Sequence, residues 1–363
     1  MKKVIKQVLG VDVSQKELVV CLGRMYDDWM PELYASKTFP NTEKGFLLLL
    51  DWVKKLTDPS IPVRYLMEAT GVYHESFAYF LKDQDLPVSI VLPNKISNYA
   101  RSLTIKTVTD KTASEAITQF GLERNLDDWE KPSPVYKKMR QLTRERDQIV
   151  VERTMVKNQI HAELAEAEPN KSSVKRINRR IEFLNNQEKE ITVELSAVIK
   201  ANKPVDDSVK LLCSIPGVGI LTAATILAET NGFELIRNKR QLTSYAGLDV
   251  KEKQSGTSVK GASKISKRGN KSLRKAMHLP ALTVIRHDPR FKAIFERMVS
   301  KHGIKMKAAV AIQRKLLEMT YTIFKTKKKY DEKYLENQGS SDAAAGDPET
   351  QQVEKNLLEP AKN

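Results

Sequence analysis

The sequence predicts an α/β domain over residues 1–130, followed by a mainly α-helical remainder. Strand-like apolar segments alternate with helical ones before residue 130, which is the pattern of an α/β fold. Apolar residues then recur at heptad spacing to about residue 203, and a basic segment with helical patterns continues to residue 329. A chain of 363 residues exceeds the size at which one core usually keeps growing, so two domains and a connector are expected.

Each element of the first domain follows from a local pattern. The runs VIKQVLGVDVS and ELVVCLGRM predict two strands joined by a polar turn, and a third strand is expected near residues 33–39. Asn41-Thr precedes the amphipathic run FLLLLDWVKKL, so a capped helix is expected there. RYLMEATG is predicted as a buried strand ending at Glu68, residues 72–81 as a helix, and PVSIVLP as a further strand.

Residues 131–203 are predicted to form an antiparallel helical hairpin that is at least partly a coiled coil. Charges separate the apolar positions, and the segment EAEPNKSS divides the two helical runs. Such an arm either dimerises the protein or packs only on itself, and the sequence leaves both readings open. The heptad-spaced residues are Val135, Met139, Leu142, Ile149, Val156 and Ile160, then Val174, Ile177, Ile181, Leu184, Ile191, Leu195 and Val198.

Residues 204–329 are predicted to form a mainly helical domain that engages DNA. LLCSIPGVGILTAATILAE places two glycines between two helices, which indicates either a hairpin whose loop amides meet a phosphate or an ordinary tight turn. Residues 251–329 contain 22 lysines and arginines against four acids, so most phosphate contacts are expected here. The tail over residues 330–363 is acidic and is expected to be disordered.

The overall composition restricts the class of protein. A formal net charge of +16 and a pI near 9.5 indicate a polyanionic partner, for which nucleic acid is the first candidate. Cys21 and Cys213 are the only cysteines, so neither a disulfide framework nor a cysteine zinc site is supported. No window approaches a membrane span, and we expect a cytoplasmic, nucleoid-associated protein without a membrane partner.

Three carboxylates of the first domain stand where metal chemistry would need them. Asp12 interrupts the apolar first strand, and Glu68 ends a second buried strand in the same way. Asp110 begins a predicted helical segment and, taken alone, is best explained as a helix N-cap. Together the three acids would hold two divalent ions, magnesium or manganese, for phosphodiester chemistry. An actin-like ATPase also opens with Gly-x-Asp, but no glycine-rich phosphate loop follows here.

A serine of the last domain is the candidate nucleophile. Ser255-Gly256 is expected in an exposed loop that leads into a basic segment, and serine attacks phosphorus where cations stabilise the developing charge. Taken alone, Ser-Gly is more often simply a turn. The cations expected to bind nucleic acid are Lys264, Lys267, Arg268, Lys271 and Arg274.

An ordered set of motifs resembles one family. GVDVS, YLMEATGVY, LPNKISNYARS, TDKTASEAI, SIPGVGILTAATILAE, LTSYAGL and QSGTSVKGASKISKRGNKSLRKAM occur in this order between residues 10 and 325. The set resembles the DEDD-type insertion-sequence transposases of the IS110 family, which are related to Piv DNA invertases.

The resemblance implies a RuvC-like N-terminal domain of the ribonuclease-H type, a coiled-coil connector and a C-terminal transposase domain. It gives Asp12, Glu68 and Asp110 three acidic catalytic positions and gives Ser255 the nucleophile's position. It also implies DNA as substrate and, in some members, a bridge RNA that pairs with donor and target DNA. Because the acids and Ser255 lie in different predicted domains but must meet at one phosphate, we expect a composite site assembled in a homodimer or homotetramer.

One departure from the family pattern affects the metal site. The family has a second aspartate three residues after the position of Asp110, where this sequence has Ala113. Either the chain is a substituted form with a weakened metal site, or Ser114 or Glu115 compensates, although Glu115 is expected to point elsewhere on a helix. Three acids are therefore the supported set. A junction nuclease in which water attacks, and a non-catalytic nucleic-acid scaffold, remain the alternatives.

Overall fold

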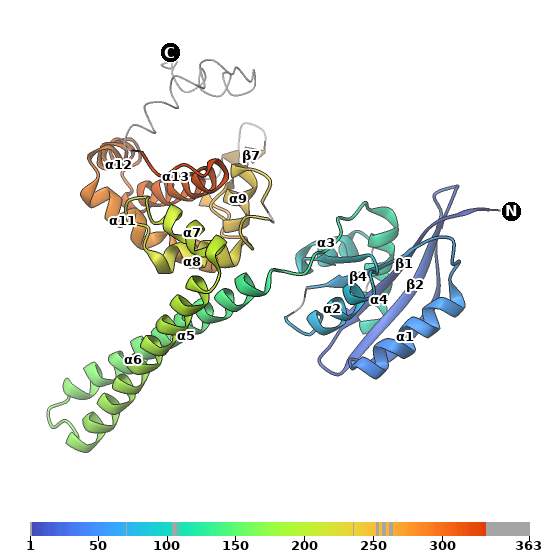
Figure 1. The fold of residues 1–363 in the computed structure, drawn as a ribbon, viewed down its shortest axis with the longest axis horizontal. Helices are drawn as coiled ribbons and strands as arrows, with labels where there is room; N and C mark the ends of the chain where they lie inside the picture. Colours follow the sequence, from blue (N-terminus) through green and yellow to red (C-terminus); the bar gives the residue numbers. More distant parts are fainter. Residues whose placement is uncertain are drawn as a thin grey trace, which may run out of the picture. The chain divides into compact units, whose positions relative to one another are not determined.

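The computed structural model describes residues 2–69, 71–103, 107, 109–234, 236–251, 254–255, 259–260 and 264–331. For Gln254, Ser255, Val259, Lys260 and His302 it describes the backbone alone. The chain divides into two compact units, Met1–Lys131 and Pro132–Asn363 (Figure 1). The predicted acidic tail lies outside the described residues from position 332 onward.

The first unit is built on a five-stranded sheet of mixed direction. The strand order is β3-β2-β1-β4-β5, in which the first three strands run antiparallel and β4 and β5 run parallel to β1. The α/β prediction is confirmed, and each predicted strand is present. The strands are β1 (Val4–Val13), β2 (Glu17–Tyr26), β3 (Pro31–Pro40), β4 (Val63–Glu68) and β5 (Val88–Val91).

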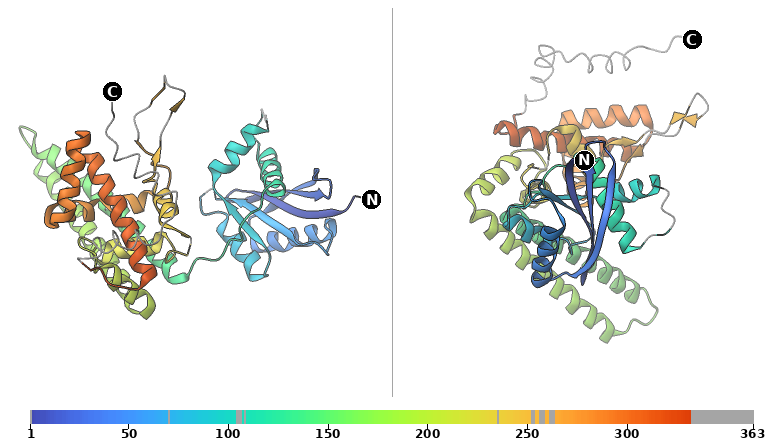
Figure 2. Two further views of the ribbon diagram at one scale, coloured as in Figure 1. Left: turned by 90° about the horizontal axis from the view of Figure 1, so that it is seen from above. Right: turned by 90° about the vertical axis from the view of Figure 1, so that its right-hand side faces the viewer.

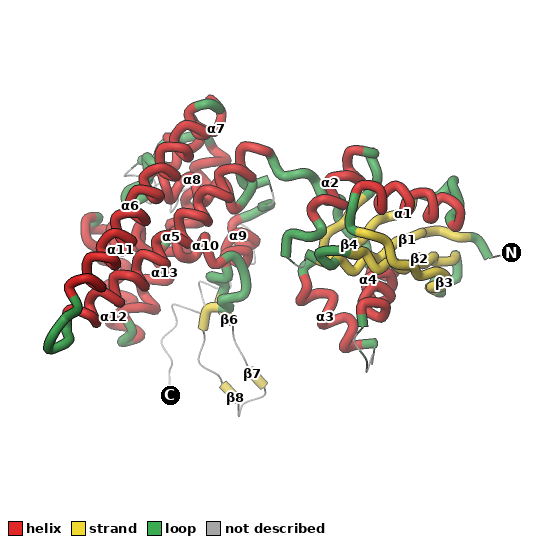
Figure 3. Tube along the Cα trace, turned by 90° about the horizontal axis from the view of Figure 1, so that it is seen from below, coloured by secondary structure: helices red, strands yellow, loops and turns green. Residues whose placement is uncertain are grey.

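Helices cover both faces of this sheet. Figure 3 shows α1 (Glu43–Leu56) and α2 (Glu75–Asp83) over one face, and α3 (Pro93–Ser102) and α4 (Asp110–Glu123) over the other. The right-hand view of Figure 2 separates the same two layers, with the blue α1 and the green α3 and α4 on opposite sides of the strands. The sequence pattern does not predict α3, whose first residue is a proline and which buries little beyond Ile96 and Tyr99.

Alternation along β1 divides the core into two layers. Leu9, Val11 and Val13 face the cluster that includes α1 and α2, whereas Val8 faces the cluster that includes α3 and α4. Even-numbered residues of β1 therefore point toward α4. The period of two along a strand thus determines which face of the sheet Asp12 occupies.

The second unit begins with two long antiparallel helices, α5 (Pro134–Leu164) and α6 (Lys171–Lys200). Asn170 caps α6 through its side chain, which accepts hydrogen bonds from the amides of Ser172 and Ser173. Buried residues recur every seven positions on α5, as at Leu142 and Ile149. The helical hairpin is therefore present, while its classification as a coiled coil stays a prediction.

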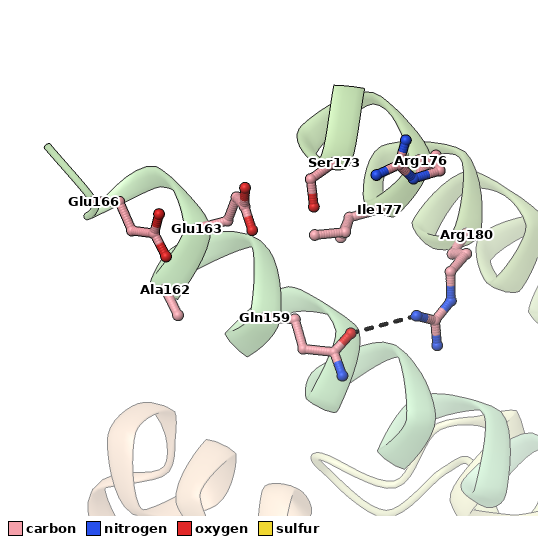
Figure 4. A pocket seen from close by; sticks show the side chains of 8 residues that line it. All are labelled: Gln159, Ala162, Glu163, Glu166, Ser173, Arg176, Ile177 and Arg180. Atoms are coloured by element: carbon pink, nitrogen blue, oxygen red, sulfur yellow. Dashed lines mark hydrogen bonds between the residues drawn. The ribbon is translucent and has the colours of Figure 1, made fainter. Parts of the chain in front are cut away.

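A shallow pocket of about 590 Å³ lies at the tip of this hairpin. In Figure 4 the side chains of both helices line it, and Arg180 donates a hydrogen bond of 3.4 Å to Gln159. Glu163 and Glu166 stand on the other side of the same pocket. Because its charges are of both signs, the pocket has no clear preference for an anionic ligand.

Seven further helices and two short two-stranded ladders complete the described part of the second unit. One hydrophobic core runs from Met139 of α5 to Ile323 near the end of the last helix, so the base of the hairpin and the helical bundle share a core. No helix among the described residues is long and apolar enough to cross a membrane. The elements are α7 (Lys203–Leu212), α8 (Ile220–Glu229), α9 (Lys239–Ala246), β6 (Val250–Lys251), β7 (Gln254–Ser255), β8 (Val259–Lys260), β9 (Lys264–Ile265), α10 (Lys271–Ala276), α11 (His278–His287), α12 (Pro289–His302) and α13 (Lys305–Thr326).

Candidate functional site

The register of two parallel strands makes Asp12 and Glu68 neighbours. Val11 of β1 pairs with Met67 of β4, and both strands continue by one residue in the same direction. Directly opposite residues of paired strands project to the same face of a sheet. Asp12 and Glu68 therefore lie side by side on the α4 face, at the carboxyl ends of their strands.

Helix α4 brings the third acid to the same edge. Gly10 lets the helix approach β1 closely, since a Cβ on Gly10 would stand 2.3 Å from the hydroxyl of Thr118. That hydroxyl accepts a hydrogen bond from the Gly10 amide at 3.1 Å and donates to the Cys21 carbonyl at 2.9 Å. Asp110 is one turn of helix before Ser114, whose carbonyl also lies against Gly10. This direction of the helix carries Asp110 toward Asp12.

The pKa of Asp12 reflects the two acids near it. Burial raises the pKa of the Asp12 carboxyl to about 6, and the nearby carboxylates of Asp110 and Glu68 contribute to the rise. Like charges at such a site favour either a shared proton or a cation that neutralises them. Among the described residues, no group of three acidic, histidine or cysteine side chains is close enough to be a preformed metal site. Asp110 and Glu68 therefore act on the charge of Asp12, although the three carboxylates stand farther apart than the ligands of one bound ion.

The helix start corrects one interpretation of Asp110. Thr109, not Asp110, is the N-cap of α4, and its side chain accepts the amide hydrogen of Thr112 at 3.2 Å. Thr112 in turn accepts from the Thr109 amide at 2.8 Å, which completes a capping box. Since another residue performs the capping, the Asp110 carboxylate is not needed for it, and a negative charge at this first helical position is favourable in any case.

Neither neighbour of Ala113 replaces the missing acid. Ser114 is fully buried and donates its hydroxyl hydrogen to the Lys111 carbonyl at 2.7 Å. Glu115 pairs with Lys111 at 4.0 Å and influences Cys21 of β2 rather than Asp12. Ala113 itself is half-buried on the first turn of α4, one turn from Asp110. The expectation that Glu115 points elsewhere therefore agrees with the contacts.

In the second unit, Ser255 lies on a strand rather than in the expected loop. It belongs to β7 and pairs with Val259 of β8. Gly256 and the side chain of Ser255 lie outside the described residues. The neighbouring ladder of β6 and β9 pairs Val250 with Ile265, at the base of the segment that carries the serine.

The base of this segment is held by a buried network. Glu229 at the end of α8 is 1% exposed and accepts two hydrogen bonds from Arg144 of α5, at 2.7 and 2.8 Å, and one from Asn270 at 2.7 Å. Burial alone would raise the pKa of Glu229, but these donors hold the pKa below its usual value. Asn270 also caps α10 by accepting the Leu273 amide hydrogen at 3.0 Å. The start of α10 is therefore fixed to α5 and α8.

The five predicted nucleic-acid cations follow β8 in the chain and lie on β9, in the next turn and on α10. Lys264, Lys267, Arg268 and Lys271 are exposed, as phosphate contacts require. Arg274 is half-buried and donates to the Ala246 carbonyl at 2.7 Å, so it also holds the turn together. Sequence reasoning missed three further basic residues beside them, Arg146, Lys275 and His278. Arg146 is more than a hundred residues away in the chain, and no sequence pattern connects it to this region.

Comparison with protein families identifies the class of protein. The model described as "Transposase" for DEDD proteins of IS110 elements matches residues 9–169, and the model described as "Transposase IS116/IS110/IS902 family" matches residues 209–296. The first range contains Asp12, Glu68 and Asp110, and the second contains Ser255. The chain belongs to the IS110 family of transposases.

Relatives of known name cover nearly the whole chain. The pilin gene-inverting proteins of Moraxella bovis and Moraxella lacunata are each 28% identical over 91% of this chain and 99% of their own length. The transposase for insertion sequence element IS1111A of Coxiella burnetii is 24% identical over 77% of this chain and 78% of its own.

Similarity to solved structures is weak. Thermus thermophilus RuvC in complex with a Holliday junction substrate is 8% identical, with a TM-score of 0.26, over 34% of this chain and 99% of its own. An Aquifex aeolicus member of the Ppx/GppA family covers 88% of this chain and 91% of its own, with 12% identity and a TM-score of 0.22. Scores this low carry no weight for fold or function.

Proposed function

We propose that this transposase cleaves and rejoins DNA strands by using the acids of the first unit and Ser255 of the second. The observation that carries the proposal is the coupling of Asp12 with Glu68 and Asp110 at one edge of the sheet. Partly buried carboxylates that lie near one another lower the stability of the fold unless a bound cation neutralises them. Such groups are therefore typical of metal-binding and catalytic sites. Membership of the transposase family supports the reaction class, and a RuvC-like, ribonuclease-H-type first domain remains part of the proposal.

The donor chemistry of the three acids suits magnesium or manganese. Asp12, Glu68 and Asp110 offer oxygen ligands only, which is the donor set that these hard cations prefer. Burial and the nearby carboxylates of Asp110 and Glu68 raise the pKa of Asp12, which supports a role for a neutralising cation. A bound divalent cation would supply charge neutralisation at the reacting phosphate. Asp12 must be deprotonated to serve as a ligand, and the absence of an acid at position 113 weakens the site.

Ser255 is proposed to act as the nucleophile. Its Oγ forms a bond to phosphorus while the bond from phosphorus to the leaving deoxyribose oxygen breaks, and the serine proton passes overall to that oxygen. The reverse step on a second strand end releases the serine and restores a phosphodiester. The exposed cations on β9, in the next turn and on α10 would stabilise the negative charge that develops on phosphorus.

DNA is the proposed substrate, and a bridge RNA is the proposed guide. The excess of basic residues in the second unit supports a nucleic-acid partner of either kind. We also propose a homodimer or homotetramer as the active assembly. Exposed apolar side chains on the helical hairpin support association, namely Val151, Met155, Phe183 and Val193.

The test is a search for a protein–DNA adduct. Full-length protein with its copurified RNA is incubated with nicked suicide DNA carrying the ends of the element, and the products are separated on denaturing gels. A protein-sized shift is expected for wild type and for Ser258→Ala, but not for Ser255→Ala. Cleavage without an adduct would establish a water-using nuclease, and binding without cleavage would establish a scaffold.

A further inference from the structure

A groove with cationic walls and an apolar floor lies beside the ladder that leads to Ser255. Its volume is about 680 Å³, and it lies between α5, α8, α10 and α11. Leu248, two residues before β6, and Ile265 of β9 contribute to its lining. The groove therefore opens where the two strands toward β7 and β8 begin. Its position ties it to the segment that carries the candidate nucleophile.

The walls are strongly basic. Among the described residues, five cations line the groove against a single acid, Asp147, which pairs with Lys275 at 3.0 Å and with Arg146 at 3.7 Å. Arg146 also pairs with Glu188, outside the lining, at 2.6 Å. The phosphate groups of a nucleic acid can neutralise this excess of positive charge. The five are Arg146, Lys267, Lys271, Arg274 and Lys275.

The floor is apolar and accessible, which a duplex backbone does not explain. Leu279 of α11 is 71% exposed, and Leu221 and Leu248 lie deeper in the same lining. Phosphates and sugars of a duplex gain little from apolar side chains, whereas a base taken out of the stack packs its face against apolar or aromatic side chains. A volume of this size, within the roughly 300–1,000 Å³ of small-molecule sites, holds a nucleotide rather than a helix of DNA.

One polar pair is placed to orient such a base. Gln313 of α13 is 5% exposed, and its Nε2 donates to His278 Nδ1 at 2.8 Å. This contact fixes the position of the imidazole ring, which lines the groove. A few fixed polar groups in an apolar lining are what orient a ligand.

We propose that this groove binds one unpaired nucleotide of the DNA strand that Ser255 attacks. The base lies on Leu279, its edge faces His278, and its flanking phosphates meet Lys271 and Lys275. The inference rests on the proposed function, because it takes Ser255 as the nucleophile. It adds that the reacting strand is locally unpaired, with a base taken out of the stack.

The test measures binding alone, in the Ser255→Ala background, so that no adduct forms. Fluorescence anisotropy compares a single-stranded DNA, an RNA of the same sequence and the corresponding duplex DNA at one salt concentration. Leu279→Glu should weaken single-stranded DNA binding by about tenfold, or about 1.4 kcal/mol, because a charged side chain replaces the apolar contact with the base. Duplex binding should change little. Leu282→Glu makes the same change one turn along α11, at a residue outside the lining, and is the matched control.

A second measurement follows the base itself. A 2-aminopurine in the single strand should brighten on binding, because its fluorescence rises when it leaves the stack, and Leu279→Glu should remove that rise. Equal losses for single strand and duplex, equal losses for Leu282→Glu, or a loss confined to RNA would each overturn the proposal. A negative result in these binding experiments would not change the outcome of the adduct assay. A negative adduct assay would overturn the serine mechanism without changing the measured affinities.

Discussion

The two units of this transposase differ most in how they carry charge. Residues 1–131 contain 17 lysines and arginines against 18 acids, whereas residues 132–363 contain 44 against 27. The first unit is nearly neutral but concentrates three carboxylates at one sheet edge. The second unit carries all of the net positive charge. Affinity for nucleic acid and metal-dependent chemistry are therefore expected to reside in separate parts of the chain, so that each can be removed without the other.

The largest expected effect separates the two functions at the acids. Asp12→Asn or Glu68→Gln should abolish strand cleavage while leaving DNA affinity unchanged, because a ligand is lost but the basic surface remains. Cleavage gels and binding isotherms on the same protein measure both. Asp51→Asn, which neutralises an exposed carboxylate on α1, is the control and should retain cleavage. Loss of DNA binding in the Asp12→Asn variant would show that nucleic-acid affinity and cleavage do not reside in separate units.

The next effect is on the basic unit. Replacing Lys264, Lys267, Arg268 and Lys271 with glutamine should lower the slope of log affinity against log salt by about 3.6, since each phosphate contact contributes roughly 0.9. The matched control replaces four exposed lysines of the first unit, Lys16, Lys44, Lys54 and Lys55. An equal change in both variants would mean that the footprint is not confined to the second unit.

A smaller effect is expected from restoring the missing acid. Ala113→Asp places a carboxylate on the first turn of α4 beside Asp110, and cleavage should become several-fold faster at limiting magnesium. Titration of the metal at constant DNA measures the change. Unchanged activity with an intact fold would show that this chain does not use position 113.

The pH dependence of cleavage should follow Asp12. Its pKa is raised to about 6, so the carboxyl is increasingly protonated as pH falls through 6 and metal binding is lost. The cleavage rate should therefore drop about tenfold per pH unit below that point. Saturating metal should move the midpoint downward. A rate that is flat between pH 7 and pH 5 would argue against Asp12 as a ligand.

The smallest effect concerns stability without metal. A carboxyl whose folded-state pKa lies above its ordinary value of 3.8 favours folding when protonated, so this contribution is lost as pH rises from about 4 to 6. At pH 7 in chelator, Asp12→Asn should be more stable than wild type by no more than about 1 kcal/mol, after allowance for solvent screening. Thermal melts measure it, and magnesium should stabilise wild type alone.

Local patterns predict most of the elements of the first unit. The period of two in β1 and β2 and the polar residues before α1 follow directly from the residues themselves. Helix α3 is not predicted, because it has too few apolar residues to form a helical pattern. The sequence around Ser255 suggests a loop, because a strand of two residues shows no periodicity. The N-cap of α4 is ambiguous in the sequence, since both Asp110 and Thr109 suit that position.

The sequence by itself determined the candidate acids, the family motifs and the basic character of the second unit, because residue type and order carry that information. Only the tertiary structure decided which acids meet. The pairing of Val11 with Met67 makes Asp12 and Glu68 neighbours, and close packing at Gly10 directs Asp110 toward them. The groove was likewise invisible in the sequence, since Arg146 and Lys275 come together only through packing of helices distant in the chain. Contacts of this kind depend on register and helix packing, which short-range patterns do not encode.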